Sequence, residues 1–155
     1  MKIGDKATDF NLKDEDEQTF TLSKNLGKWV VLYFYPKDNT PGCTTEALEF
    51  TAALADFTAR NTVVVGVSPD SCQSHQRFKV KHDLGIRLLA DPDRQVMKAY
   101  GAWADKSMYG KTFLGVVRST VLIDPQGRIA HHWPKVKAQG HAAAVKETLA
   151  ALQSS

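Results

Sequence analysis

A chain of 155 residues with 43% hydrophobic and 24% charged residues has the composition of an ordinary globular protein, which argues against disorder. The net charge of +3 comes from Lys and Arg scattered among Asp and Glu, so nothing favours nucleic acid or anionic lipid as a partner. The sequence lacks a signal-peptide core and any run of the roughly 18 apolar residues of a membrane helix. We expect a single cytoplasmic domain, residues 1–155.

Strand and helix patterns alternate along the first half of the chain. Acidic turn residues between short apolar pieces predict a small hairpin over 9–21. Residues 29–35 and 62–68 are continuous apolar runs, typical of strands covered on both faces. Between them, a helix is predicted by apolar residues at helical spacing, namely Ala47, Phe50, Leu54 and Phe57. Two buried strands joined by a helix should be parallel, with a right-handed crossover.

The second half predicts more helices and an antiparallel pair. Helices are expected over 71–83 and 93–100. Strands over 116–123 and 128–133 should form a hairpin around the turn Asp-Pro-Gln-Gly, and the alanine-rich stretch 141–152 should form a closing helix. Together these elements predict an α/β protein with a thioredoxin-like fold, in which helices flank a central mixed sheet and a hairpin precedes it.

A cysteine stands at the start of the first long helix. Pro36 ends the preceding strand, and Pro41-Gly42 turns the chain so that Cys43 lies in the first helical turn. Free backbone N–H groups and the positive end of the helix dipole favour a thiolate there, and the thiolate is the nucleophilic form of cysteine. Thr40 can offer its hydroxyl to a group that approaches the sulfur. From the residues alone, Cys43 is either a reactive nucleophile or a buried structural thiol.

The same residues carry a family resemblance. Pro36, Thr40 and Cys43 match the peroxiredoxin signature PxxxTxxC, and the string YPKDNTPGCTTEALEF resembles the bacterioferritin-comigratory (peroxiredoxin Q) subfamily. The resemblance continues in four stretches, GDKATDF at 4–10, GVSPDS at 66–71, KSMYGK at 106–111 and VVRSTVLID at 116–124. It implies a peroxidatic cysteine at position 43, a hydroperoxide substrate, and no metal or organic cofactor.

Arg118 and Glu46 are further candidates for the site. In the apolar run 116–123, Arg118 either faces a cleft or points to solvent from an antiparallel strand. In the resembled family an arginine from a late strand reaches the thiolate, and the matching residue is Arg118. With Thr40 and the backbone N–H groups of Gly42 and Cys43, it would stabilise the charge that leaves the sulfur as Cys43 becomes a sulfenic acid.

Substrate contacts are expected from Pro36, the backbone of Gly42, and Glu46. Glu46 either suits the positive end of the helix dipole or organises the site by hydrogen bonds.

The recycling step is where the sequence departs from the family. Many members carry a second cysteine where this chain has Leu48, and others where it has Lys79; the only other thiol is Cys72, at the start of the next predicted helix. Three hypotheses stay open. Cys72 forms a disulfide with Cys43 that thioredoxin reduces; an external thiol from glutathione, glutaredoxin or thioredoxin attacks the sulfenic acid; or Cys72 is inert.

Other polar and aromatic residues are weaker candidates. The adjacent strand residues His131 and His132 point to opposite faces, and His75 and His82 lie two helical turns apart, so we expect no metal site. The resemblance brings the stretch around Tyr109 near the site rim, and simple packing is the alternative for these aromatics.

We therefore expect a monomeric thiol peroxidase with a hydroperoxide substrate and thioredoxin or glutaredoxin as reductant. A thiol–disulfide oxidoreductase would need two close cysteines, as in CxxC, which the chain lacks. The alternative is a redox sensor or thiol-dependent binding protein, in which oxidation of Cys43 changes a partner surface.

Overall fold

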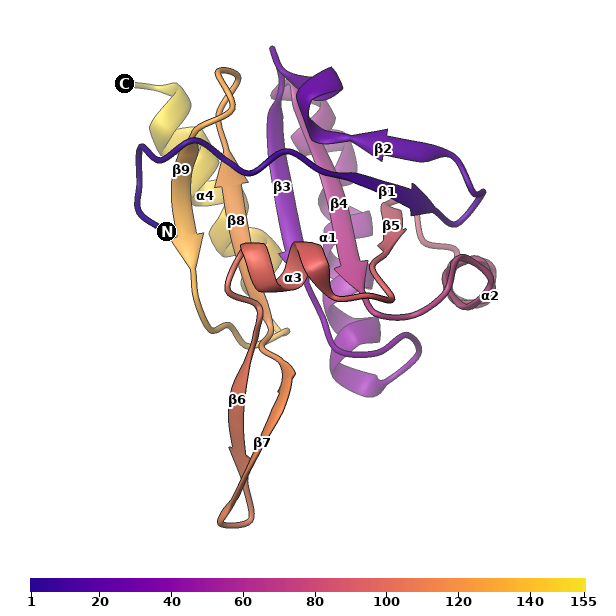
Figure 1. Cartoon of the computed structure of the whole chain (residues 1–155). Coiled ribbons are helices and arrows are strands. Elements are labelled where there is room, and N and C mark those ends of the chain that lie inside the picture. The colour runs from indigo at the N-terminus through magenta and orange to yellow at the C-terminus, as the bar shows by residue number, and fades with distance from the viewer.

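The computed structural model describes all 155 residues, and its main sheet has the strand order β2-β1-β5-β4-β3-β8-β9 (Figure 1). These strands are β1 (Asn11–Asp14), β2 (Thr19–Thr21), β3 (Trp29–Phe34), β4 (Thr62–Ser68), β5 (Arg87–Ala90), β8 (Ser119–Ile123) and β9 (Ile129–Trp133). A separate hairpin consists of β6 (Trp103–Met108) and β7 (Lys111–Val116). The helices are the 3-10 helix η1 (Leu22–Asn25), α1 (Pro41–Ala59), α2 (Cys72–His82), α3 (Gln95–Ala99) and α4 (His141–Gln153). None of the helices is both long and apolar enough to cross a membrane.

The main sheet is mixed. Strand β3 runs parallel to β4 and antiparallel to β8, β5 continues the parallel part, and β1 and β9 add antiparallel strands. Helix α1 joins the parallel pair β3 and β4. The predicted α/β class, central mixed sheet and strand–helix–strand unit are therefore confirmed.

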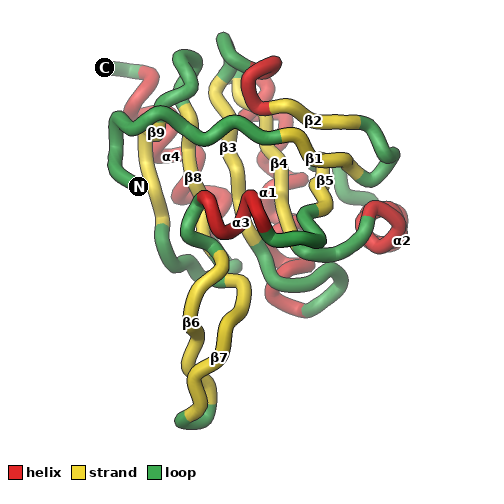
Figure 2. The backbone as a smooth tube through the Cα atoms, in the orientation of Figure 1, coloured by secondary structure: helices red, strands yellow, loops and turns green.

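Alternating side chains of β3 divide the hydrophobic core into two layers. Val30, Leu32 and Phe34 belong to the cluster that contains residues of α3, whereas Val31 and Tyr33 belong to the cluster that contains residues of α1, α2 and α4. This alternation is the period-two pattern of a strand buried on both faces. Figure 2 shows the helices on both sides of the strands, with α3 on one side and α1 and α4 on the other.

The carboxyl ends of β3 and β4 meet at one edge of the sheet, because the two strands are parallel. The loop from Tyr35 to Thr40 leaves β3 there and enters α1, and Pro69 to Ser71 leaves β4 and enters α2. The β6–β7 hairpin projects from this same end of the molecule (Figure 1). Three connections thus converge on one edge, which is where open parallel sheets place their ligand sites.

Several predicted boundaries hold and some elements differ. The N-terminal hairpin is confirmed as β1–β2, and α2 and α3 are slightly shorter than the predicted 71–83 and 93–100. The continuous strand predicted over 116–123 is wrong, because β7 ends at Val116, β8 begins at Ser119, and two residues link them. Strand β5 and the β6–β7 hairpin were not predicted.

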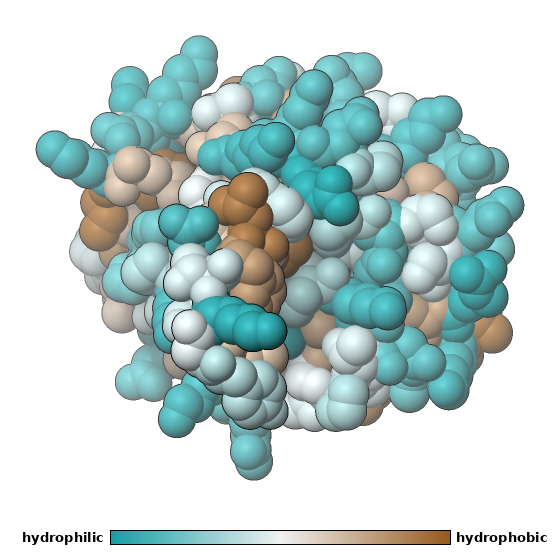
Figure 3. Space-filling view, turned by 60° about the horizontal axis from the view of Figure 1, so that its bottom comes forward, coloured by the Kyte–Doolittle hydropathy of each residue, from teal (hydrophilic) through white to brown (hydrophobic).

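The β6–β7 hairpin turns at two residues with left-handed backbone. Tyr109 and Gly110 have φ angles of 53° and 76°, as a two-residue type I′ turn requires. Large exposed apolar side chains lie along it, namely Met108, Tyr109, Phe113 and Leu114. Figure 3 brings this end of the molecule forward and shows a strip of hydrophobic side chains among mostly hydrophilic ones.

Candidate active site

Cys43 lies in the first turn of α1 with only 1% of its surface exposed. The helix begins at Pro41, which suits a first helical position because the N–H that proline lacks would have no helical partner. The Thr40 side chain does not cap the helix, and the backbone N–H groups of Gly42 and Cys43 donate to no protein group. Two free donors therefore accompany the sulfur at the positive end of the helix.

Arg118 bridges the sulfur and a buried carboxylate. Its Nη2 lies 3.3 Å from Cys43 Sγ, and its Nη1 donates to Glu46 Oε1 at 2.6 Å. Ser119, the next residue, pairs with Phe34 across the antiparallel β3–β8 pair, so Arg118 stands beside the carboxyl end of β3. Arg118 thus occupies the two-residue link between β7 and β8, and not the middle of a strand as predicted.

Gly42 leaves room for this guanidinium. A Cβ atom added at Gly42 would lie 3.1 Å from Arg118 Nη2, which is closer than an ordinary van der Waals contact. A glycine directly before Cys43 therefore allows the guanidinium to approach both the sulfur and the start of the helix.

Glu46 is fully buried one turn after Cys43. Burial raises its pKa from 4.5 to about 7, although the positive charge of Arg118 opposes the shift. The carboxylate also influences Arg118: burial lowers the pKa of the guanidinium, but Glu46 and Cys43 raise it, and the net shift is upward. Glu46 Oε2 has no hydrogen-bond partner, so only one carboxylate oxygen is held by Arg118.

Tyr33 of β3 lies in the same core layer as Cys43. Burial raises its pKa well above 10, and the charges of Glu46 and Cys43 raise it further. Its ring stacks on Phe50 at 4.7 Å between centroids, and its hydroxyl has no hydrogen-bond partner. A Cβ at Gly66 would lie 2.6 Å from the Tyr33 ring, so the neighbouring strand needs glycine there. The sequence carries no signal for this proximity, because Tyr33 is one of several aromatic residues in the β3 run.

Thr40 is half-buried directly before the helix. Its hydroxyl donates to the carbonyl of Lys37 at 2.8 Å. With its proton engaged in this bond, the oxygen keeps lone pairs that can accept a hydrogen bond from a molecule that approaches the sulfur. Pro36, also half-buried, begins the same loop.

Comparison with known proteins agrees with this geometry. The model of the AhpC/TSA family matches residues 3–132. The chain is 46% identical to "Peroxiredoxin Bcp" of Bacillus subtilis over 149 residues, which cover 96% of this chain and 95% of that protein. A putative peroxiredoxin bcp of Helicobacter pylori is 48% identical over 149 residues, 96% and 98% of the two chains. The chain belongs to the AhpC/TSA family. It is a peroxiredoxin of the Bcp type, and its activity is that of a thiol peroxidase.

Solved structures of peroxiredoxins share the fold. A Xylella fastidiosa PrxQ variant superposes with a TM-score of 0.93 at 41% identity, covering 99% of this chain and 98% of that one. The bacterioferritin comigratory protein of Xanthomonas campestris, studied for alkyl peroxide reduction, gives a TM-score of 0.88 at 42% identity, covering 92% and 91%. The thioredoxin-like fold is thereby confirmed for this peroxiredoxin.

Cys72 is the first residue of α2 and is half-buried. Burial raises the pKa of its thiol, the nearby carboxylates of Glu17 and Asp14 raise it further, and Lys13 opposes them. These three charged residues belong to the β1–β2 hairpin, whereas Cys43 is surrounded by α1 and Arg118. The two thiols of this peroxiredoxin are both free. Of the predicted site residues, Arg118, Gly42 and Glu46 lie around Cys43, Thr40 and Pro36 lie on the adjoining loop, and Cys72 lies elsewhere.

Leu48 and Lys79 occupy the two positions at which family members have a second cysteine. Lys79 forms an ion pair with the buried Glu15, which ties α2 to the β1–β2 turn, and Leu48 is exposed. Tyr109, suggested at the site rim, lies at the hairpin tip and is 95% exposed. Trp103 packs against the guanidinium of Arg94 at 4.7 Å and borders the core layer opposite to Cys43.

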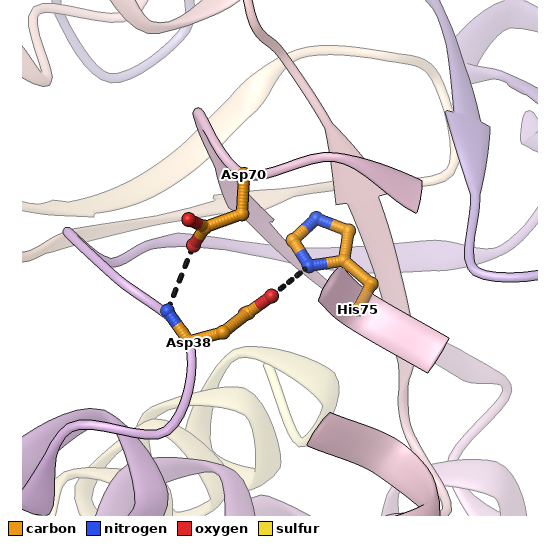
Figure 4. A group of neighbouring side chains, drawn as sticks. All are labelled: Asp38, Asp70 and His75. Atoms are coloured by element: carbon orange, nitrogen blue, oxygen red, sulfur yellow. Dashed lines mark hydrogen bonds and ion pairs between the residues drawn. The ribbon is translucent and has the colours of Figure 1, made fainter. Parts of the chain in front are cut away.

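A polar cluster that was not predicted from the sequence lies behind the active-site loop. Asp38, Asp70 and His75 bring ligand atoms within 4.8 Å of one another, a group that in principle suits a cation (Figure 4). Its atoms are already engaged with one another and with the protein: His75 Nδ1 contacts Asp38 Oδ2 at 2.7 Å, and Asp70 Oδ2 accepts from the Asp38 amide at 2.7 Å. The signal in the sequence was polar residues after each of two parallel strands.

Proposed function

We propose that Cys43 is the peroxidatic nucleophile of this thiol peroxidase. Its thiolate attacks one oxygen of a hydroperoxide, an S–O bond forms as the O–O bond breaks, and the second oxygen leaves with the electron pair. That oxygen takes up a proton and departs as water or an alcohol, and Cys43 becomes a sulfenic acid. The observation that carries the proposal is the guanidinium of Arg118 in contact with a buried sulfur at a helix start.

Charge moves from the sulfur to the departing oxygen in this step, and the surrounding donors suit that movement. Arg118 and the free N–H groups of Gly42 and Cys43 stabilise the negative charge on both atoms. The Thr40 oxygen accepts a hydrogen bond from the hydroperoxide O–H and orients it. Glu46 holds one end of the guanidinium, so that its other end stays directed at the sulfur. Pro36 and the Gly42 backbone line the substrate position.

We infer that organic hydroperoxides and hydrogen peroxide are both substrates. The exposed apolar side chains of the hairpin offer contact to an alkyl group at the sheet end where Cys43 lies. Reduction of alkyl peroxides by the Xanthomonas campestris relative supports the same substrate class.

For recycling, we propose attack on the sulfenic acid by an external thiol of thioredoxin or glutaredoxin. The position of Cys72 beside Glu17 and Asp14, with its raised thiol pKa, favours this route because it makes Cys72 a weak nucleophile at neutral pH. A Cys43–Cys72 disulfide is the second candidate. Its support is that both cysteines follow neighbouring parallel strands at one sheet edge. We further propose that the protein is a monomer and that it is located in the cytoplasm, a reducing compartment that two free thiols suit.

The deciding experiment measures steady-state hydroperoxide consumption with thioredoxin, thioredoxin reductase and NADPH, and in parallel with glutaredoxin and glutathione. Cys43→Ser should abolish turnover, and Cys72→Ser is its matched control and should keep it. Full activity of Cys43→Ser would overturn the proposal. A single burst in the wild-type protein with neither reductant supporting turnover would instead support a redox sensor.

A further inference from the structure

Four hydrogen-bond donors and acceptors converge on Asp38 in the loop that leads to Cys43. The Asp38 carboxylate accepts from the Tyr35 hydroxyl at 2.6 Å and from the Ser74 hydroxyl at 2.7 Å. His75 Nδ1 contacts the same carboxylate at 2.7 Å, and the Asp38 amide donates to Asp70. Asp38 and His75 are both buried. A loop residue with this many partners is held far more firmly than an ordinary surface connection.

These partners come from one face of α2. His75, Phe78 and His82 follow the spacing that places residues on one side of a helix. His75 holds Asp38, the ring of Phe78 packs on that of Tyr35 at 6.4 Å, and Nε2 of His82 contacts Asn39 Oδ1 at 2.8 Å. Helix α2 therefore contacts the loop at Tyr35, Asp38 and Asn39.

Each ring nitrogen of His75 has a partner in the protein. Nε2 faces the carbonyl of Leu89 at 2.9 Å, and a carbonyl only accepts, so Nε2 carries a hydrogen. Nδ1 lies 2.7 Å from a carboxylate oxygen of Asp38. The ring is thus held at both nitrogens, and removal of Asp38 would take away the acceptor of the Tyr35 and Ser74 hydroxyls and the partner of Nδ1.

The cluster reaches the reacting atoms through the backbone. Asp38 fixes the peptide that follows Lys37, and the Lys37 carbonyl accepts the hydrogen of the Thr40 hydroxyl. Thr40 in turn begins the helix whose free N–H groups surround the sulfur. A shift of the loop would therefore move Thr40 and the helix start relative to Cys43.

We propose that Asp38, held by Ser74 and His75 of α2, is the positioning residue of the peroxidatic loop. Its hydrogen bonds keep the Thr40 oxygen and the free amides of α1 at the place where the peroxide binds. The inference rests on the proposed role of Cys43. This positioning role depends on the hydrogen bonds of Asp38 and not on its negative charge, because the carboxylate holds the loop in place and does not touch the reacting atoms.

The test compares two reactions of Cys43 in each variant, both followed as second-order rate constants. Reaction with hydroperoxide needs the thiolate and the positioned donors, whereas alkylation by iodoacetamide needs the thiolate alone. Asp38→Ala should slow the peroxide reaction by about 100-fold, the size expected for a misplaced reacting group, and change alkylation by no more than about threefold. Ser74→Ala, which removes one donor and keeps the fold, should slow the peroxide reaction by about fivefold with unchanged alkylation.

Asp38→Asn is the rescue variant. Its amide oxygen still accepts from Tyr35, and its NH₂ group donates to Nδ1 of a neutral His75 that keeps its bond to Leu89. We expect its peroxide rate within about fivefold of wild type. Asp14→Ala is the matched control, because Asp14 is also a buried carboxylate, but it pairs with Arg87 and lies at the end of β1. It should lower stability and leave the ratio of the two rates unchanged.

The inference would be overturned if Asp38→Ala and Ser74→Ala kept the wild-type ratio of hydroperoxide to iodoacetamide rate constants. It would also be overturned if Asp38→Asn slowed the hydroperoxide reaction as much as Asp38→Ala. Failure of the proposed role of Cys43 would give a different result from failure of the inference about Asp38. In that case Cys43→Ser would still consume peroxide, whatever the ratios in the Asp38 variants.

Discussion

Arg118 reaches the Cys43 sulfur at 3.3 Å from a two-residue link between β7 and β8, and its other nitrogen is held by Glu46. The pairing of β8 with β3 sets this approach, because Ser119 lies opposite Phe34 at the end of the strand. The same guanidinium thus serves as a donor to the sulfur and as the counter-charge of a buried carboxylate.

Replacement of Arg118 by alanine should slow the reaction with hydroperoxide by about 100-fold, because one oriented donor is lost at the position where charge develops. The fold should persist, since the carboxyl group of Glu46 can take up a proton when its partner is gone. Stopped-flow tryptophan fluorescence gives the rate, and urea denaturation gives the stability. Arg128→Ala, which removes an exposed arginine bonded to the Gly4 carbonyl, is the control and should leave the rate unchanged. Equal rates in the two variants would mean that Arg118 has no part in the reaction.

Gly42→Ala tests the close approach of Arg118 to the helix start. The new Cβ would lie 3.1 Å from Nη2, so the guanidinium must move away from the sulfur. We expect a peroxide rate about tenfold lower with a free energy of unfolding within about 1 kcal/mol of wild type, because alanine is a better helix former than glycine. In the Arg118→Ala background the same change should have no further effect on rate. An additive loss in the double variant would show that Gly42 acts independently of Arg118.

The contribution of Glu46 to the free energy of unfolding should fall as pH rises from about 4.5 to about 7, through the ionisation of its carboxyl group. Its pKa is raised by burial to about 7, so in this window the folded protein keeps a proton that the unfolded chain has lost. The loss amounts to about 3 kcal/mol. Denaturation of wild type and Glu46→Gln near pH 5 and near pH 8 isolates the effect, because glutamine cannot ionise.

Glu46→Gln should therefore gain stability relative to wild type at the higher pH. His141 has the opposite influence, since burial lowers its pKa to about 4 and its contribution is lost as pH falls. Both proteins contain His141, so it cancels from the difference. Parallel pH profiles of the two proteins would contradict the prediction.

Tyr33→Phe should stabilise the protein by about 1 kcal/mol, because it removes a buried hydroxyl that has no hydrogen-bond partner. The peroxide rate should stay within about twofold of wild type, since the Tyr33 hydroxyl makes no hydrogen bond to the sulfur. Tyr35→Phe is the matched control: it deletes the 2.6 Å bond to Asp38, so it should be destabilising. Urea denaturation of both variants checks the contrast, and a destabilised Tyr33→Phe protein would show that its hydroxyl has a partner in solution.

The sequence predicted the elements that depend on local signals. Pro36 follows the end of a strand, and Pro41 and Gly42 start a helix, so the position of the sulfur could be deduced from neighbouring residues alone. The contact with Arg118 depends on the pairing of β3 with β8, residues far apart in the chain, and only the family resemblance suggested it. The link between Asp38 and His75 is also non-local: polar residues follow each of two parallel strands, but nothing in the sequence pairs Asp38 with His75. The β6–β7 hairpin was missed because its turn has tyrosine in a left-handed conformation, an uncommon choice for an aromatic residue.

The fate of Cys43 after one equivalent of hydroperoxide should distinguish the two recycling routes. We expect intact-mass and peptide analysis to find one added oxygen on Cys43, which dimedone traps, and no linked Cys43–Cys72 peptide. Cys72 lies among Glu17, Asp14 and Lys13 of the β1–β2 hairpin, and its thiol is poorly ionised there. A disulfide would need the Cys43 sulfur, which is 1% exposed and in contact with Arg118, to become accessible to the Cys72 thiol, so the start of α1 would first have to open. Cys72→Ser should oxidise identically to wild type. A loss of two hydrogens with a linked peptide in wild type, absent from Cys72→Ser, would instead establish Cys72 as the resolving thiol and thioredoxin as the reductant of a disulfide.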